Sequence, residues 1–250
     1  MRDGEHTTTA AARWRAWSVH LYTASSAVLS LLALDALADG RFGAAFAWLA
    51  VTMIIDCTDG TLARRFRVKE VLPYFDGAKL DDMMDYLTYV FVPLAIIVRA
   101  DLLPDGLLGF AAAAAPLLAS GYGFCESEAK TLDHFFTGFP SYWNVLALYL
   151  YVLDWSPTTN AWLLLGFSAA VFVPIRYLYP SRMRTLRLPT YVLGIIWGVM
   201  VFWLLAQFPA PSPTLARLTL FFPAYYVAVS LWVHWHTPPS PRHVPHPEPD

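Results

Sequence analysis

The stretch FGAAFAWLAVTMIIDCTDGTLAR, residues 42–64, begins as an apolar run and ends in acidic and basic residues. Its apolar part, 42–58, is close to the ~20 residues that a helix needs to cross a bilayer. Only 14% of the 250 residues are charged and 57% are hydrophobic, whereas soluble domains carry about a quarter charged residues. The composition indicates an integral membrane protein, and the net charge of -2 gives no sign of nucleic-acid binding.

Apolar runs of this kind recur along the whole chain. They predict an all-α, polytopic membrane protein with about eight transmembrane helices, at 16–35, 42–58, 80–99, 106–124, 141–154, 160–178, 190–208 and 215–236. We expect one transmembrane catalytic domain over 16–236. A cytosolic N-terminal segment, 1–15, precedes it, and a disordered cytosolic tail, 237–250, follows it.

The basic residues predict the orientation of these helices. With eight spans both termini lie on one side, and of the 17 Lys and Arg residues only Arg41, Arg99 and Arg217 then fall on the opposite side. Because cytoplasmic loops carry the excess of basic residues, we expect both termini in the cytoplasm of a bacterium, with the protein in its inner membrane. A cleaved secretory signal over the first span is an alternative, since Ala36-Leu37-Ala38 resembles a cleavage site.

Two acidic segments flank one predicted loop on the cytoplasmic side. An ionised carboxylate at mid-bilayer costs about 2.5–3.5 kcal/mol, so such residues need a reason. The first segment, 56–64, closes the second span, and the second, GAKLDDMMD at 77–85, opens the third. Because the two spans are adjacent and antiparallel, the segments should meet in space.

Helical spacing places the key residues of each segment on one face. Asp56, Asp59, Gly60 and Ala63 follow the i, i+3, i+4, i+7 pattern, and Gly77, Asp81 and Asp85 recur at steps of four. Asp82 projects about 100° away from Asp81 and is not expected to take part.

Four converging carboxylates would repel one another without a cation. They predict a site for Mg²⁺ or Mn²⁺, which prefer oxygen ligands and can bridge phosphate oxygens. The small residues at 60, 63 and 77 leave room for a base or ribose to approach the backbone. Arg64 could hold a phosphate with both arms of its guanidinium. The simpler interpretation, in which the acids only cap helices and pair with nearby basic residues, does not account for the matching offsets of Gly and Arg.

These residues resemble the signature of the CDP-alcohol phosphotransferases, D-x2-D-G-x2-A-R followed by a spacer and G-x3-D-x3-D. Every specified position is present. The spacer, 65–76, has twelve residues, which is longer than the commonest in that family and is similar to that of bacterial phosphatidylcholine synthases. The segments 75–77, 85–89 and 138–144 add to this resemblance.

The resemblance implies substitution at phosphorus, in which CDP-diacylglycerol and choline give phosphatidylcholine and CMP. It assigns metal binding to Asp56, Asp59, Asp81 and Asp85, with Asp85 also the catalytic base. CDP binding is implied for Asp59, Gly60, Ala63, Arg64 and Gly77. Homodimers are common among such proteins, but no residue of this chain decides the matter.

The choline and lipid contacts are predicted more loosely. Quaternary ammonium groups bind aromatic faces beside a carboxylate, and the candidates at the cytoplasmic level are Tyr86, Tyr89, Tyr122, Tyr142 and Trp143, with Glu126 or Glu128 as countercharge and Asn144 as a polar anchor. Interfacial belts and packing also use such aromatic residues. Among the arginines after the sixth span, Arg182 is the candidate for the lipid phosphate or diphosphate, and attraction to anionic headgroups is an equal alternative.

Three other functions fit parts of the pattern. Serine, inositol or glycerol phosphate could replace choline as the acceptor. A polyprenyl-transferring enzyme also gathers aspartates around magnesium diphosphate, but it has no reason to carry the Gly60 to Arg64 pattern. A divalent-cation transporter would need polar groups at mid-depth on several helices, whereas the carboxylates here lie at one end.

Overall fold

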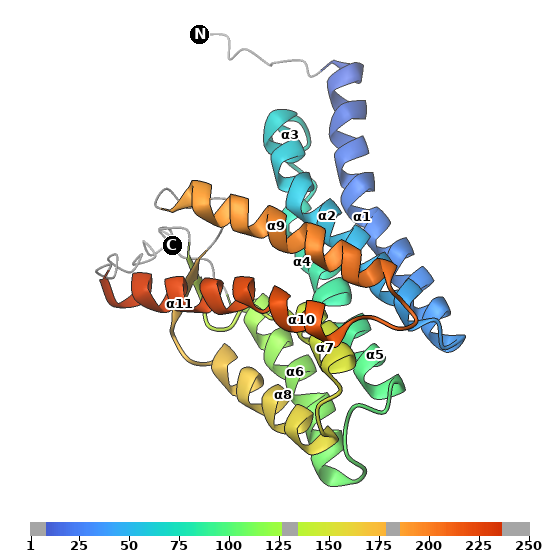
Figure 1. Cartoon of the computed structure of the whole chain (residues 1–250). Coiled ribbons are helices and arrows are strands. Elements are labelled where there is room, and N and C mark those ends of the chain that lie inside the picture. The colour runs from blue at the N-terminus through green and yellow to red at the C-terminus, as the bar shows by residue number, and fades with distance from the viewer. Residues whose placement is uncertain (1–8, 127–134, 179–185, 237–250) are drawn as a thin grey trace.

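The computed structural model describes residues 9–126, 135–178 and 186–236, and these are almost entirely helical (Figure 1). The elements in chain order are α1 Ala10–Ala38, α2 Phe42–Arg65, α3 Val68–Val71, α4 Gly77–Asp85, η1 Tyr86–Phe91, α5 Val92–Arg99, α6 Leu107–Cys125, β1 Phe135–Thr137, α7 Trp143–Leu153, α8 Pro157–Val171, β2 Arg176–Leu178, α9 Arg187–Ala206, α10 Pro213–Thr219 and α11 Phe221–His236.

Helices α1 and α2 form a long hairpin, and α4, η1 and α5 make one continuous rod that packs against it. The expected spacer between the acidic segments contains the last residue of α2, the short α3 and a turn. Asp76 caps α4, because its Oδ1 accepts a hydrogen bond of 3.0 Å from the backbone N–H of Lys79. The chain then continues into α4, whose first residue, Gly77, lies against α1.

The core lies where α5 and α7 meet, with α2, α9 and α10 around them. Its fully buried side chains include Ile96, Ile97, Leu150 and Trp143. The outward faces of the long helices expose large apolar groups, such as Ile195 and Trp203 on α9. An apolar outer surface is stable against lipid chains but not against water, so this pattern fits a protein that lies in a bilayer.

In the part of the chain that the structure describes, five helices are long and apolar enough to cross a membrane: Ala10–Ala38, Phe42–Arg65, Leu107–Cys125, Arg187–Ala206 and the joined Pro213–His236. They coincide with five of the eight expected spans. The span expected at 80–99 is a helix that starts earlier, at Gly77, and contains a π-turn. Helix α7, at 11 residues, reaches only about 16 Å at 1.5 Å per residue.

The span expected at 160–178 is wrong at its C-terminal end. Helix α8 stops at Val171, and 176–178 form strand β2, which pairs antiparallel with β1. The chain is therefore not purely α-helical. Arg176 ties this small sheet to α11, since its backbone N–H donates to Nδ1 of His234 and its guanidinium donates to the His234 carbonyl. Three-residue strands carry no periodic signal by which the sequence could reveal them.

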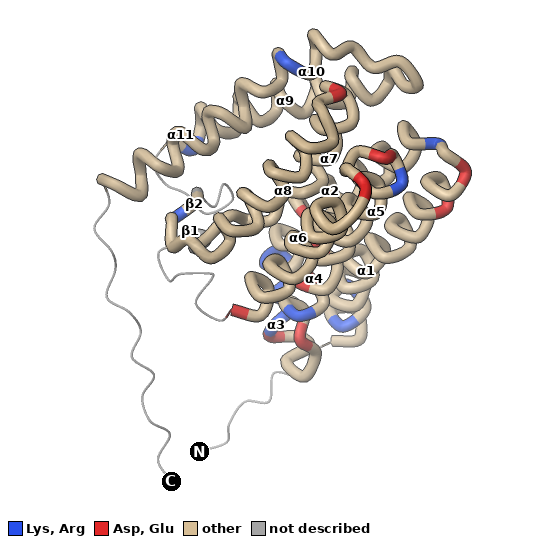
Figure 2. The backbone as a smooth tube through the Cα atoms, turned by 90° about the horizontal axis from the view of Figure 1, so that it is seen from below, with Lys and Arg blue, Asp and Glu red and all other residues tan. Residues whose placement is uncertain are grey.

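Charged residues lie mostly toward the ends of the helices, and few interrupt the long apolar stretches (Figure 2). At the end opposite α3, Arg41 pairs with Asp35 and Asp39 at 3.4 and 2.9 Å. These pairs are exposed and contribute little to stability. The acidic residues of α2 and α4 differ from them, because they lie on faces that turn toward each other.

Candidate active site

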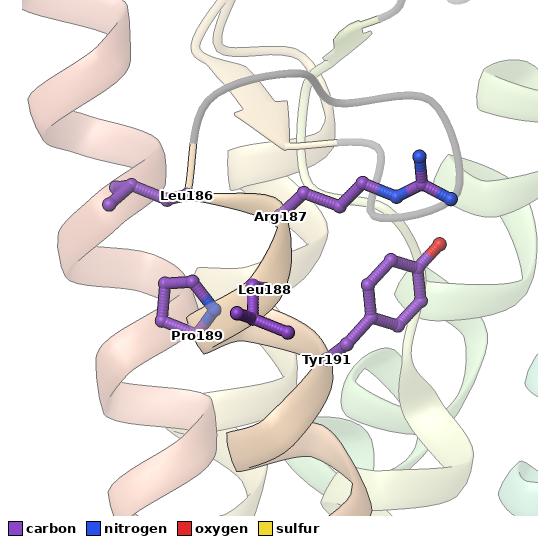
Figure 3. Close-up of a pocket in the computed structure, with 5 residues that line it drawn as sticks. All are labelled: Leu186, Arg187, Leu188, Pro189 and Tyr191. Carbon is purple, nitrogen blue, oxygen red and sulfur yellow. The ribbon is translucent and has the colours of Figure 1, made fainter.

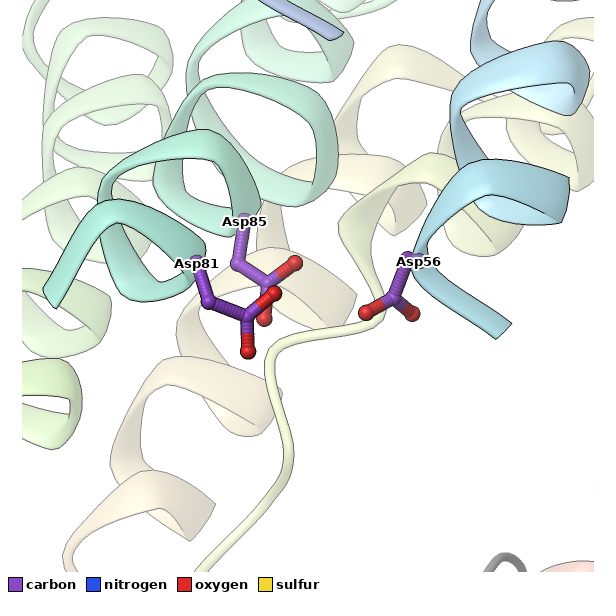
Figure 4. Close-up of side chains that lie close together, drawn as sticks. All are labelled: Asp56, Asp81 and Asp85. Carbon is purple, nitrogen blue, oxygen red and sulfur yellow. The ribbon is translucent and has the colours of Figure 1, made fainter. Parts of the chain in front are cut away.

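Three carboxylates from two helices meet at the junction of α2 and the α4–η1 rod. Asp56 points from α2 toward Asp81 and Asp85 of α4 (Figure 4). Each can offer an oxygen such that all three oxygens lie within 4.8 Å of one another, and each residue is half-buried. The convergence expected from the two helical faces is therefore present. Oxygens at this spacing can bind one divalent cation together, because each ligand oxygen lies roughly 2.0–2.6 Å from such an ion.

Asp59 is placed differently from these three. It lies one turn further along α2, is only 6% exposed, and accepts a hydrogen bond of 2.8 Å from Thr23 Oγ1 of α1. It also shares a side-chain hydrogen bond with Asp81. Asp59 is thus joined to the acidic cluster through Asp81, at the edge of the cluster rather than at its centre.

Tyr89 also contacts the cluster. Its phenol donates a hydrogen bond of 2.6 Å to Oδ2 of Asp56. Tyr89 belongs to η1, a π-helical turn that starts directly after Asp85. π-turns inside α-helices are rare and occur often at functional sites.

The small residues of the signature have two kinds of surroundings. A Cβ on Gly60 would meet only Arg64 Nη1, at 3.4 Å, so this backbone is open. A Cβ on Gly77 would lie 2.6 Å from Cε1 of His20. Ala63 packs against a small cluster of buried residues between α1 and α3. The close approach of α1 thus already explains why position 77 is glycine, apart from any nucleotide.

Arg64 is exposed at the end of α2. Its guanidinium donates to Thr61 Oγ1 at 3.1 Å and extends over Gly60. Because it is neither buried nor locked in an ion pair with a described residue, its charge stays available next to the open backbone. Asp82, which was expected to point away, is not part of the three-carboxylate group.

The residues predicted to bind choline lie in different parts of the structure. Tyr142 lies near the acids: its ring centroid is 6.0 Å from that of Tyr89, and it interacts electrostatically with Asp56 and Asp85. Tyr86 instead faces α6, where its hydroxyl donates to the Leu117 carbonyl at 3.1 Å.

Trp143 and Asn144 face away from solvent. Trp143 is fully buried, and its indole N–H donates to Ser120 Oγ at 2.7 Å. Asn144 lines a small, mainly apolar cavity between α2, α7 and α9. Glu126 ends α6, where Tyr122 donates to it at 2.7 Å and packs on Phe172 beyond α8.

The region predicted for the lipid phosphate is only partly described. Arg182 lies outside the described residues, as does Glu128. The start of α9 forms an open pocket lined by Leu186, Arg187, Leu188, Pro189 and Tyr191, in which the Arg187 guanidinium carbon lies 5.5 Å from the Tyr191 ring centroid (Figure 3). None of these residues belongs to the acidic cluster, so the pocket is separate from it.

Two residues of α1 beside the site, His20 and Thr23, were missed by the sequence interpretation. Both are buried, at 7% and 6% exposed. The signal that could have found them is a pair of polar residues three apart inside a long apolar helix, since buried polar groups in membrane spans usually face protein partners.

Comparisons with known proteins show which sequences this chain is similar to. No family model matches the chain. The chain is 40% identical to the phosphatidylcholine synthase of Pseudomonas aeruginosa over 218 residues, which are 87% of this chain and 91% of that protein. It is 37% identical to the phosphatidylcholine synthase of Legionella pneumophila, over 87% of this chain and 88% of that protein. The phosphatidylcholine synthase of Bradyrhizobium diazoefficiens is 38% identical, with 89% and 80% covered.

The chain belongs to the phosphatidylcholine synthase family. Similarity at this level spreads over most of both chains, so it extends well beyond the acidic segments. Members of the phosphatidylcholine synthase family are transferases of phospholipid biosynthesis, and this chain is accordingly an enzyme. The resemblance seen in the signature is confirmed.

Proposed function

We propose that this chain transfers the phosphatidyl group of CDP-diacylglycerol to choline and releases CMP, at the cluster of Asp56, Asp81 and Asp85. The single observation that carries the proposal is the meeting of these carboxylates from two helices, in a chain that belongs to the phosphatidylcholine synthase family. The acidic group lies at the helix ends, where a soluble nucleotide can leave while the acyl chains stay among the apolar helix faces.

The donor set suits Mg²⁺ or Mn²⁺. Three carboxylate oxygens within 4.8 Å of one another, with Asp59 beside them, form a hard, anionic ligand set of the kind that these ions prefer. When bound, the cation neutralises the diphosphate and the negative charge that develops on CMP as it leaves. Asp56, Asp81 and Asp85 would hold the cation, and Asp59 would support the site through its hydrogen bond to Asp81.

The remaining roles follow from the positions of the side chains. Asp85 is the proposed base: it takes the proton from the choline hydroxyl as that oxygen attacks the phosphorus. Arg64, over the open backbone of Gly60, would hold diphosphate oxygens. We propose that Gly60, Ala63 and Gly77 border the cytidine.

Choline recognition is proposed for the aromatic rings next to Asp56 and Asp85. Tyr142 lies between Tyr89 and Tyr226, with ring centroids 6.0 and 5.9 Å away. A quaternary ammonium donates no hydrogen bonds and is bound by aromatic faces near negative charge. Tyr142 and Tyr89 meet both conditions better than Trp143, which is buried against Ser120.

The membrane topology belongs to the same proposal. We infer eight crossings over 16–236, with 1–15 and 237–250 in the bacterial cytoplasm and the active site on that side of the inner membrane. The positions of Arg64, Arg65 and Lys79 beside the acidic cluster support a cytoplasmic site. Reporter fusions in the loops at 66–76 and 100–106 should report cytoplasm and periplasm, respectively; equal signals would contradict the orientation.

The deciding experiment is an acceptor assay on the purified chain. With Mg²⁺ and CDP-diacylglycerol, CMP should appear when choline is added, and phosphatidylcholine should form in equal amount. Serine, inositol and glycerol phosphate, tested in parallel, should give no CMP above background. CMP release with one of them and not with choline would move the chain to another acceptor. Release of pyrophosphate instead of CMP would point to a different reaction.

A further inference from the structure

Two buried hydroxyl groups donate hydrogen bonds to the acidic residues of α2. Tyr89 donates to Asp56 Oδ2 at 2.6 Å, and Thr23 donates to Asp59 Oδ2 at 2.8 Å. The donors come from different elements, η1 and α1, which both pack against α2. Both are more than nine-tenths buried, so a water molecule could not easily replace either of them.

The π-turn explains how Tyr89 reaches Asp56. Asp81, Asp85 and Tyr89 are spaced by four residues, and each such step in an α-helix overshoots a full turn by about 40°. Two α-helical steps would therefore rotate position 89 well away from Asp81. In η1 the backbone N–H of Val92 bonds to the Leu87 carbonyl, five residues back. In this wider turn, four residues rotate by less than a full revolution. This shortfall offsets the overshoot of the step from Asp81 to Asp85, so Tyr89 returns to the face of Asp81.

Each hydrogen bond fixes one oxygen of a carboxylate. A carboxylate that accepts a charge-assisted bond on one oxygen is held in one rotamer, and its other lone pairs remain free to bind a cation. Groups that orient metal ligands in this way commonly change metal affinity by about 10–100-fold when they are removed. The donor and acceptor pairs here have this geometry.

We propose that Tyr89 and Thr23 are positioning residues that hold the Asp56 and Asp59 carboxylates toward α4, so that a divalent cation binds a preformed site. This inference rests on the proposed function, because it assumes that the acidic cluster binds a cation. The π-turn then has a purpose: without it, Tyr89 would leave Asp56 unsupported.

The test measures Mn²⁺ binding directly by electron paramagnetic resonance on the purified full-length chain, without lipid or choline. Tyr89→Phe and Thr23→Val should each weaken Mn²⁺ binding by about tenfold. Thr23→Ser keeps the hydroxyl and should restore most of the affinity. The metal-induced rise of the unfolding temperature should shrink in parallel.

A matched control is Tyr149→Phe. Tyr149 is also a buried phenol, but it bonds Thr219 and Trp197 in the core, away from the acids. The Tyr149→Phe substitution should lower the unfolding temperature and leave Mn²⁺ binding unchanged. If Tyr89→Phe behaves like this control, or if Thr23→Ser binds Mn²⁺ as poorly as Thr23→Val, the positioning role is wrong.

Failure of the proposed function is distinguishable from failure of this inference. Wild-type protein that binds Mn²⁺ but releases no CMP with choline would refute the acceptor, while the comparison of variants would still decide the positioning role. Wild-type protein that binds no Mn²⁺ at all would overturn both.

Discussion

The backbone of Gly77 lies against the imidazole of His20, so closely that a methyl group at position 77 would be 2.6 Å from Cε1 of the ring. The ring cannot easily move, since Phe75 packs on it at a centroid distance of 4.3 Å and Trp17 at 5.8 Å. Helix α1 therefore fixes where α4 begins, and with it the position of Asp81.

Gly77→Ala should destabilise the protein and reduce activity. The overlap forces α4 away from α1 at a cost of about 1–3 kcal/mol, as is typical of overpacking. Thermal unfolding in detergent measures the loss. Adding His20→Ala should recover part of it, because the two positions are in contact and their effects are not additive. Gly198→Ala is the control: a Cβ there meets nothing within 4 Å. An additive double variant would show that the contact is not the cause.

The sequence was sufficient to predict that acidic side chains of α2 and α4 converge, because two simple rules determine this arrangement. Apolar runs define the helices, and a repeat of three or four residues defines one helical face. Asp56, Asp81 and Asp85 satisfy both rules, and the structure brings them together. The contribution of α1 could not be predicted, because which face of α1 meets Asp59 and Gly77 depends on tertiary packing and not on local spacing.

The aromatic residues show a second limit. Tyr142 and Trp143 are neighbours in the sequence and equally plausible as acceptor contacts, yet one lies near the acids and the other is fully buried in the core. Tyr142 precedes α7 and Trp143 is its first residue, so their side chains have different surroundings that no composition rule distinguishes. The π-turn after Asp85 is similarly invisible in the sequence YLTYVF.

Asp85→Asn should abolish turnover more completely than it weakens binding of CDP-diacylglycerol. An amide is isosteric with the carboxylate and can still contact a cation through its oxygen, but it cannot accept the choline proton. CMP release measures turnover, and calorimetry with CDP measures binding. Asp82→Asn is the matched control, because Asp82 adjoins the cluster without belonging to it. Parallel losses of turnover and binding in Asp85→Asn would assign it a metal-holding role only.

Arg64→Gln should raise the KM for CDP-diacylglycerol about tenfold or more and leave the KM for choline unchanged. The guanidinium is exposed over Gly60, and loss of a charge-assisted bond to phosphate costs roughly 1.5–3 kcal/mol. Arg64→Lys should recover the affinity only in part, because an ammonium cannot bind phosphate oxygens in the same two-armed way. Arg67, which pairs with Glu70 at the start of α3, serves as the control through Arg67→Gln. A matching rise of KM in that control would indicate a general effect of charge.

Tyr142→Ala and Trp143→Ala should impair different properties of the protein, choline binding and stability respectively. Removing Tyr142 takes away a ring beside Asp56 and Asp85, so the KM for choline should rise while CDP binding stays the same. Removing Trp143 leaves a core cavity and breaks its hydrogen bond to Ser120, at a cost of about 3–5 kcal/mol, so the unfolding temperature should fall sharply. Trp143→Phe, which refills most of the cavity, should retain the wild-type choline KM. A raised choline KM in Trp143→Phe, together with an unchanged one in Tyr142→Ala, would place the acceptor against the buried tryptophan and not between the tyrosines.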